Sequence, residues 1–298
     1  MNMSLSPIIL FVYNRPDETQ KALAALRQNI LAPDSDLFIF SDAPKNPDVG
    51  QKVQQVRKIV HSIEGFKSVH IIEAEKNKGL AHSVIDGVSQ IIEKYGKVIV
   101  LEDDLITSPN FLSFMNQALD FYENNQQIIS ITGCTYRLRI PKNYEYDVFF
   151  THRMGSHGWA TWLNCWQNID WKVSDYDSFK YNIRQNLALM KGGNDLPRML
   201  AACMKGKINS WAVRFCYHQY KTQTYTVWPA QSKVQNIGCN AAASNMKREK
   251  PLDRIDFTPS SEIKFCFTSQ IFIDKTINRR FLLKFRIVVR IITNFLIR

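Results

Sequence analysis

Three consecutive carboxylates, Glu102, Asp103 and Asp104, follow directly on the apolar run Val98 to Leu101. Like charges at one strand end repel each other unless a cation or a network of donors neutralises them. Oxygen ligands suit Mg²⁺ or Mn²⁺, and Mg²⁺ commonly binds through one or two carboxylates together with substrate phosphates. An acidic helix-capping turn before Pro109 is the alternative. The triplet predicts a site for a divalent cation and a phosphorylated substrate.

Other polar residues stand at the same kind of position, directly after an apolar run. They are Asn14 and Arg15 after Pro7 to Tyr13, Asp42 after Leu37 to Phe40, and the segment Glu73 to Leu80 after Val69 to Ile72. Helical spacing of apolar residues follows in 17–30, 49–63 and 79–95, and Ser108-Pro109 predicts a further helix start. Alternating strands and helices predict a doubly wound, mostly parallel sheet with ligands at the carboxyl ends of its strands. All these polar residues should therefore surround one crevice.

The chain changes character after Ile128 to Thr132, which predicts a fifth strand. Tryptophans then occur in quick succession, at Trp159, Trp162, Trp166 and Trp171, and no Gly/Ser-rich or charge-rich linker precedes them. We therefore expect the second half to pack on the same sheet as an extension of one domain.

The stretch Val100 to Leu105 resembles the acidic metal motif of GT-A-fold glycosyltransferases, in the Glu-Asp-Asp form of the N-acetylglucosaminyltransferase I family. Five further stretches are similar to bacterial family-two-like sugar transferases of surface-polysaccharide pathways, namely 9–16, 37–45, 77–84, 155–162 and 206–214. The resemblance covers about residues 7 to 240. It implies a GT-A, Rossmann-like α/β fold with helices on both faces of the sheet. It also implies a nucleotide-sugar-binding half in 1–133 and an acceptor-binding, catalytic half of the same domain in 134–260.

The resemblance also assigns roles to residues of the crevice. Tyr13, Asn14 and Arg15 would hold the nucleotide, and Asp42 would accept hydrogen bonds from its base. Asn77, Lys78 and Gly79 lie where a loop enters a helix, and the backbone N–H groups and the lysine there would meet the diphosphate or the sugar. Glu102 and Asp103 would contact the sugar or the ribose, and Asp104 would bind Mn²⁺ or Mg²⁺. The simpler alternatives are that Asp42 serves only as a turn residue and that the Lys78 side chain is only solvated.

Inversion, which the resemblance also implies, needs a carboxylate that takes the proton of the acceptor hydroxyl. Asp195 lies about where the family has this base, and its alternative role is that of a helix N-cap. Asp170, Asp175 and Asp177 are competing candidates.

Two further side chains of the second half are candidates for donor contacts. Trp159 could stack on the apolar face of a sugar, whereas Trp162, three residues further on an expected helix, is assigned to the core. Arg214 could pair with a phosphate, or form a surface salt bridge. The histidines have no metal-ligand spacing, so no zinc site is expected.

One departure from the family pattern concerns the segment after Asn236-Ile237-Gly238. Related sequences continue into a glycine-rich stretch that ends in a histidine, whereas this chain continues into Ala241 to Asn245. If that histidine helps to hold the metal or the diphosphate in relatives, its absence bears on metal affinity and metal dependence here; a metal-dependent glycosyltransferase is still the expected enzyme.

Positive charge is concentrated at the C-terminus. The net charge is +11, and residues 275–298 contain seven basic and no acidic residues, which leaves +4 for the rest. Phe281, Phe285 and Val288 fall on one face of a helix and the basic residues on the other. We expect 261–298 to form a basic amphipathic tail whose residues 275–298 bind an anionic membrane surface without crossing it. A C-terminal helix packed on the core is the alternative.

Composition narrows the functional classes. Hydrophobic residues make up 45% and charged residues 22% of 298 residues, which excludes a disordered chain. The six cysteines have no CxxC spacing, no secretory signal is visible, and no nucleic-acid-binding motif is present, so a cytoplasmic protein at the inner membrane face is expected.

The function expected is transfer of a sugar from a nucleotide diphosphate sugar, with a UDP-sugar as the expected donor. The expected acceptor is a lipid-linked saccharide in capsule, O-antigen (lipopolysaccharide) or exopolysaccharide synthesis. The alternatives are a nucleotidyltransferase that makes a sugar nucleotide, which would need glycines after the first strand, and a non-catalytic sugar- or nucleic-acid-binding protein.

Overall fold

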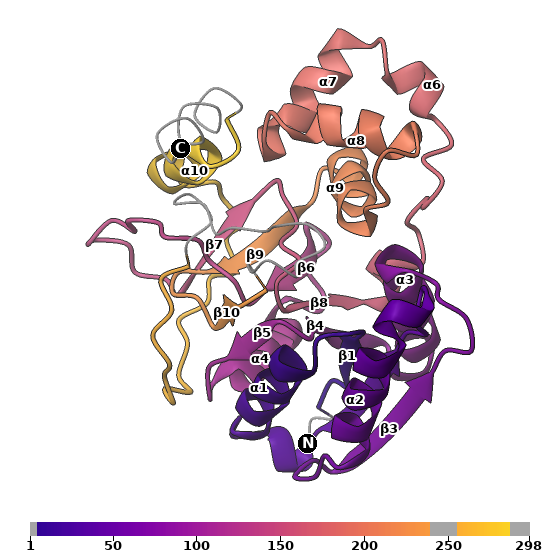
Figure 1. The fold of residues 1–298 in the computed structure, drawn as a ribbon. Helices are drawn as coiled ribbons and strands as arrows, with labels where there is room; N and C mark the ends of the chain where they lie inside the picture. Colours follow the sequence, from indigo (N-terminus) through magenta and orange to yellow (C-terminus); the bar gives the residue numbers. More distant parts are fainter. Residues whose placement is uncertain (1–4, 239–254, 287–298) are drawn as a thin grey trace, which may run out of the picture.

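A computed structural model describes residues 5–238 and 255–286 (Figure 1). In this part of the chain an eight-stranded sheet has the order β3-β2-β1-β4-β8-β6-β9-β7. Its strands are β1 (Ile8–Val12), β2 (Asp36–Ser41), β3 (Ser68–Glu73), β4 (Lys97–Glu102), β6 (Ile128–Thr132), β7 (Val148–Thr151), β8 (Trp159–Trp162) and β9 (Tyr225–Pro229). β7 and β8 run against the others. A separate two-stranded sheet pairs β5 (Leu105–Thr107) with β10 (Val234–Asn236).

Helices cover both faces of the sheet. Helices α1 (Pro16–Arg27), α2 (Gly50–His61) and α4 (Phe111–Tyr122) share one hydrophobic layer with it, and α3 (Leu80–Tyr95), α8 (Leu196–Met204) and α9 (Trp211–Thr222) share the other. The remaining helices are α5 (Leu163–Trp166), α6 (Tyr176–Phe179), α7 (Ile183–Leu189) and α10 (Lys275–Leu283), with 3₁₀ turns at Ala32–Asp34, Pro47–Val49 and Met190–Gly192. The predicted α/β class with a mostly parallel sheet is confirmed.

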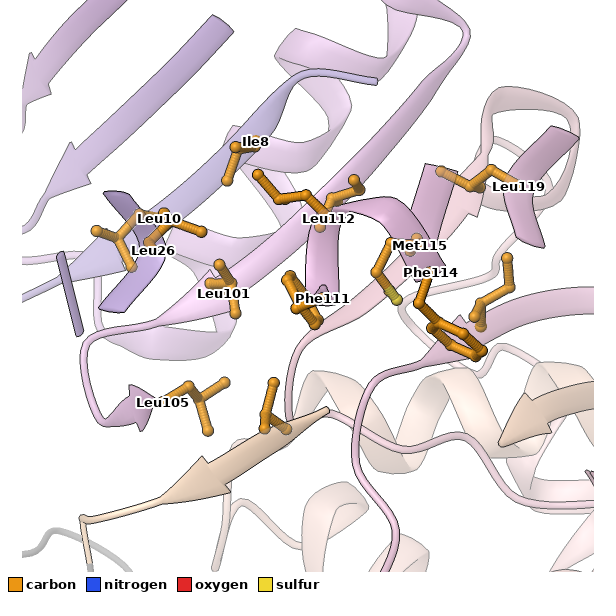
Figure 2. Close-up of a cluster of buried hydrophobic side chains, with 14 of the residues drawn as sticks. Ile8, Leu10, Leu26, Leu101, Leu105, Phe111, Leu112, Phe114, Met115 and Leu119 are labelled. Atoms are coloured by element: carbon orange, nitrogen blue, oxygen red, sulfur yellow. The ribbon is translucent and has the colours of Figure 1, made fainter. Parts of the chain in front are cut away.

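Burial of both sheet faces explains why the first strand is apolar throughout. Alternate side chains of β1 enter opposite layers, with Ile8 and Leu10 in one and Ile9 and Phe11 in the other. Figure 2 shows the first layer, where side chains of β1, β4 and α1 meet those of α4.

Two local predictions are wrong. Trp159 to Trp162 form strand β8 rather than a helix, because the segment is inserted antiparallel between β4 and β6 and its side chains alternate between the layers. The helix expected to open with Ser108 as its cap and Pro109 as its first residue begins instead at Phe111 after Asn110, and the Ser108 hydroxyl bonds to the backbone of Ser260 rather than capping the helix.

The C-terminal part wraps back onto the sheet. Residues in the range 262–268 lie along α4 and accept hydrogen bonds from the side chains of Asn110, Gln117 and Tyr122. Helix α10 then buries Ile277 and Phe281 against the sheet edge.

This packing changes the interpretation of the basic tail. In its described part, the apolar side that was expected to face a membrane contacts the protein instead, while residues 287–298 lie outside the described residues. Across 5–238 and 255–286, no helix combines the length and the apolar character that crossing a bilayer requires.

Candidate active site

The acidic triplet lies where parallel strands β1 and β4 end side by side. Glu102 is the last residue of β4 and is paired with Phe11 of β1. Asp103 and Asp104 form the turn into β5, and the backbone N–H of Tyr13 donates to Asp103 Oδ2 at 3.2 Å. The carboxyl ends of the two strands thus bring the triplet and the Tyr13 segment together, as the sequence predicts.

Arg15 is the cation of this cluster. Its Nη1 lies 2.8 Å from Asp104 Oδ2 and 3.8 Å from Asp103 Oδ1, and the exposed fractions of the three side chains are 16%, 14% and 11%. Burial opposes the charge of Arg15, but the Asp103 and Asp104 carboxylates outweigh it and raise the pKa of the guanidinium. One arginine therefore faces three carboxyl groups.

The pKa values of the triplet report this imbalance. Burial, then the charges of Asp104 and Asp103, raise the pKa of Glu102 to about 8. Burial and the charge of Asp104 raise the pKa of Asp103 to about 7, although Arg15 and the N–H of Tyr13 act in the opposite sense. The three carboxyl groups outnumber the one guanidinium, so a further positive charge would stabilise the ionised cluster.

The segment after β10 covers Asp104. The N–H of Ile237 donates to the carbonyl oxygen of Asp104 at 2.8 Å, and Asn236 Oδ1 accepts from the N–H of Gly238 at 2.8 Å. A Cβ on Gly238 would stand 2.0 Å from Asp104 Oδ2. Only glycine therefore permits this approach. The family departure at 239–245 lies outside the described residues.

A second cluster forms around the Asp42 carboxylate, which joins the end of β2 to the start of α3. Oδ1 accepts from the N–H groups of Ala43 and Lys78, each at 2.9 Å. Oδ2 accepts from Asn77 Nδ2 at 3.0 Å and from the N–H of Gly79 at 2.9 Å. The expected turn role of Asp42 is therefore present, extended to a loop 36 residues away.

The two clusters meet through Tyr13. Its hydroxyl accepts from the N–H of Lys45, in the loop that follows Asp42, at 3.0 Å. Gly79 has a φ of +71° at the N-cap of α3, a conformation that favours glycine. The Lys78 ammonium extends instead to Asp86, 2.9 Å away on α3, while Asn14 is partly buried between Tyr13 and Arg15.

The donor set around Asp104 fits a divalent cation of the Mg²⁺ or Mn²⁺ type. Within the described ranges, no three His, Cys, Asp or Glu side chains converge as a preformed metal site. Such cations do not need one, since one or two carboxylates suffice when substrate phosphates complete the shell. The uncompensated charge of the triplet supplies the attraction, and Asp104 Oδ2 is the atom that Arg15 holds in the absence of a cation.

Asp195 lies in a third cluster, in the second half of the chain. Arg153 donates from Nη1 to Asp195 Oδ1 at 2.8 Å and from Nη2 to Oδ2 at 3.1 Å. The Phe285 ring covers the guanidinium, whose Cζ lies 3.9 Å from the ring centroid. Asp195 occupies the N-cap position of α8, but its side chain makes no cap hydrogen bond there. Its carboxylate is held by Arg153 rather than by its own helix.

The three competing aspartates lie at the surface. Asp175 pairs with Lys221, and Asp177 pairs with Lys180. Asp170 accepts from the N–H groups of Lys172 and Ser174 in its own turn. Local loop and surface contacts account for all three.

The structure places Trp159 in the core rather than at a ligand-facing surface. Its side chain is 1% exposed, and its ring stacks on Trp211 at 4.7 Å and on Trp166 at 5.6 Å. Trp162 is buried, as predicted. Arg214 donates to Asn209 at 2.9 Å in the helical part of the second half, and it forms no salt bridge with any of the described residues. These contacts correct the donor assignment of Trp159 and leave that of Arg214 without structural support.

Two residues of these clusters, Arg153 and Gly238, are not predictable as site residues from the sequence pattern above. Arg153 is an isolated arginine after a strand, with no motif around it. Gly238 stands out only as the start of a departure from the family, whereas Asn77 belongs to the loop that the sequence predicts at the site. An Asn-x-Gly spacing after a strand is the available signal for Gly238, because it is typical of a tight backbone turn.

Comparisons with known proteins agree with this architecture. Residues 8–177, more than half of the chain, match Glycosyl transferase family 2. No curated protein matches significantly. Several solved structures are similar in fold. A mannosyltransferase from Pyrobaculum calidifontis in complex with GDP-Man and Mn²⁺ has a TM-score of 0.44 and 10% identity, over 74% of this chain and 70% of that one.

Two other structures have comparable scores. S. aureus TarS 1-349 has a TM-score of 0.42 and 11% identity, over 78% of this chain and 61% of that one. A UDP-glucose pyrophosphorylase complexed with UDP-glucose has a TM-score of 0.37 and 12% identity, over 78% of this chain and 92% of that one. The family match defines the class of this protein as a glycosyltransferase. Within this class, the chain belongs to Glycosyl transferase family 2.

Proposed function

We propose that this protein transfers a sugar, with inversion, from a nucleoside diphosphate sugar to a hydroxyl of a lipid-linked saccharide. The observation that supports it most is the Arg15, Glu102, Asp103 and Asp104 cluster at the joined ends of β1 and β4, covered by Gly238. Family membership favours transfer over nucleotide-sugar synthesis or simple binding. A UDP-sugar donor and a role in capsule, O-antigen or exopolysaccharide synthesis belong to the same proposal.

The donor half binds the nucleotide and its diphosphate. Tyr13 and Asn14 line the nucleotide site, and the Asp42 network keeps the loop before α3 in place beside it. Asp104 is the proposed ligand of Mg²⁺ or Mn²⁺, and Glu102 and Asp103 are the proposed contacts to the sugar or the ribose. When bound, the cation stabilises negative charge on the departing diphosphate. Arg15 then becomes available to donate to a phosphate oxygen, because its present acceptor is Asp104.

Asp195 is the proposed base. The acceptor hydroxyl oxygen forms a bond to the anomeric carbon, the bond from that carbon to the diphosphate oxygen breaks, and its electron pair leaves with the diphosphate. The hydroxyl proton passes to Asp195. Each carboxylate oxygen has more than one acceptor site, so the pairing with Arg153 orients Asp195 and leaves capacity for the hydroxyl.

The membrane part of the proposal concerns the location of the acceptor. A peripheral position at the inner membrane face would let the enzyme reach a lipid-linked saccharide. In the tail, this position at the membrane is supported by the sequence of residues 287–298, which is apolar with basic residues.

The test combines ligand binding with one substitution. Thermal stability is measured with UDP-, GDP-, CMP- and dTDP-sugars, each with Mn²⁺, Mg²⁺ or chelator, because a ligand specific for the folded state raises the melting temperature. We expect one nucleotide to stabilise the protein, more strongly with a divalent cation. Asp104→Asn should abolish this cation effect and reduce transfer at least about a hundredfold.

Asp34→Asn is the matched control, since it removes an exposed carboxylate in the 3₁₀ turn Ala32–Asp34, away from the proposed site residues. Its ligand response should equal that of the wild type. Unchanged turnover in Asp104→Asn would refute the cation site, and the absence of any nucleotide response would refute donor binding.

A further inference from the structure

The most exposed large apolar side chains of the described residues gather on one short helix. Tyr181, Ile183 and Leu187 are 83%, 75% and 61% exposed, whereas the next is 48% exposed. Ile183 and Leu187 are four residues apart on α7 and so share one face, and Tyr181 lies two residues before the helix begins. Three adjacent side chains with this exposure form an apolar surface rather than scattered exceptions.

The surrounding part of the chain is basic. From Tyr176 to Thr222, the span of α6 to α9, there are eight Lys and Arg residues and two Asp residues. Both aspartates are engaged, Asp177 with Lys180 and Asp195 with the buried Arg153. Within the described residues only Lys180 and Lys221 of the eight form ion pairs. The six others are Arg184, Lys191, Arg198, Lys205, Lys207 and Arg214.

Charge and apolar surface coincide at α7 itself. Arg184 lies between Ile183 and Leu187 in the sequence and is exposed, as is Lys191 in the 3₁₀ turn that follows the helix. The Lys180 ammonium lies 4.9 Å from the centroid of the Tyr181 ring. An aromatic ring and aliphatic side chains flanked by Lys and Arg are the composition of surfaces that insert shallowly into anionic bilayers.

The basic α10 lies at the same end of the molecule. Figure 1 shows α10 at the upper left and α6 and α7 at the upper right of the view. A direct contact agrees with this arrangement, because Gly193, just after the 3₁₀ turn, packs so closely on Phe285 that a Cβ at this glycine would stand 3.0 Å from Phe285 Cβ. Lys275, Arg279 and Arg286 are exposed.

We propose that Tyr181, Ile183 and Leu187, with the basic residues beside them, form a docking surface for a lipid bilayer that contains anionic headgroups. A second copy of the chain fits less well, since a two-fold contact through this surface would place basic side chains against each other. The inference stands on the surface alone and does not require transferase activity.

The test uses the full chain and sedimentation with vesicles. Vesicles of phosphatidylcholine are compared with vesicles that contain about 30% phosphatidylglycerol, at low and high salt. We expect binding to the anionic vesicles that weakens with salt. The double variant Ile183→Asp/Leu187→Asp should reduce it at least about tenfold, because it removes the apolar contact and adds repulsion.

Ile30→Asp/Ile263→Asp is the matched control, with the same charge change at two exposed apolar positions outside α6 to α9. It should stay within about twofold of the wild type. All variants keep residues 287–298, so equal binding by wild type and the α7 variant would assign binding elsewhere and overturn the proposal. A wild-type dimer that the α7 variant dissociates in sedimentation velocity would also overturn it, in favour of a contact between copies.

Discussion

At the scale of single residues, the site is a charge balance in which Arg15 partly neutralises three carboxyl groups. The guanidinium holds the same Asp104 oxygen that the proposed cation needs. Arg15 and the cation therefore compete until a diphosphate offers the arginine another acceptor. Binding of the cation should then depend on the nucleotide.

Replacing Arg15 tests this competition without any turnover. Arg15→Gln should bind Mn²⁺ about tenfold more tightly than the wild type in the absence of nucleotide, because an ion pair with Asp104 no longer has to be broken. Isothermal titration with Mn²⁺ measures the difference. Lys21→Gln, an exposed position on α1, is the control. Equal affinities in the wild type and Arg15→Gln would rule the competition out.

The raised pKa values predict how stability depends on pH. Glu102 has a pKa of about 8 in the folded protein and an ordinary value of 4.5, so the folded state binds its proton more tightly than the unfolded state. The stabilisation is complete below pH 4.5 and is lost as the pH rises towards 8. Asp103 acts in the same sense, with a pKa of about 7.

Thermal unfolding with chelator at about pH 5, 6, 7 and 8 measures this loss. Glu102→Gln should flatten the decline, since an amide does not titrate, and Mn²⁺ should restore stability to the wild type mainly at the upper end of the range. A variant whose curve runs parallel to that of the wild type would contradict the assignment.

At the scale of elements, the site depends on loops that are joined across the ends of the strands. The Asp42 carboxylate connects β2 to the N-terminus of α3 through three hydrogen bonds, from Asn77, Lys78 and Gly79. The segment after β10 closes over the turn between β4 and β5 in the same way. Strand ends position these residues, and side chain to backbone bonds hold the loops.

Asp42→Ala should lower the free energy of unfolding by about 2 kcal/mol, because several donors at the start of α3 lose a charged acceptor. Urea unfolding measures the change. It should also weaken nucleotide binding, through the loop. Asp48→Ala, at an exposed position in the 3₁₀ turn Pro47–Val49, should be close to neutral. Weakened nucleotide binding with unchanged stability would instead favour a direct contact between Asp42 and the base.

At the scale of the whole molecule, the C-terminal helix supports the residue proposed as the base. Phe285, two residues after α10, covers Arg153, which holds Asp195. Residues separated by about half the sequence thus share one buried cluster. Up to residue 286, the tail expected to leave the protein for a membrane packs its apolar side chains Ile277, Phe281 and Phe285 on the sheet edge.

Phe285→Ala and Phe281→Ala separate these roles. Both side chains are buried, so each loss should cost about 3 kcal/mol of stability. Phe285→Ala should in addition lower kcat relative to Phe281→Ala, because it frees Arg153 and Asp195 to move, while KM for the donor stays the same. Steady-state kinetics below the melting temperature of both variants measures the difference. Equal kcat values would show that the helix contributes packing alone.

The local pattern of the sequence was sufficient for the first half of the fold. Each strand from β1 to β4 is a short apolar run, each following helix has an apolar stripe, and parallel topology then brings the strand ends together. That rule predicts that Tyr13 and Arg15 lie close to the acidic triplet. Alternation alone could not identify β8, because a Trp-Ala-Thr-Trp segment fits a helix as well as a strand until its neighbours are known.

Tertiary structure decided the contacts that no local pattern encodes. The pairing of Asp195 with Arg153, the approach of Gly238 to Asp104, the burial of Trp159 and the docking of α10 all join residues that are distant in the chain. Residue types and spacing determine which chemistry is available, since they set charge, ligand type and the period of each element. Which side chains come into contact depends on long-range packing, because the order and direction of all the strands in the sheet determine which segments become neighbours. Neither segment encodes that contact by itself.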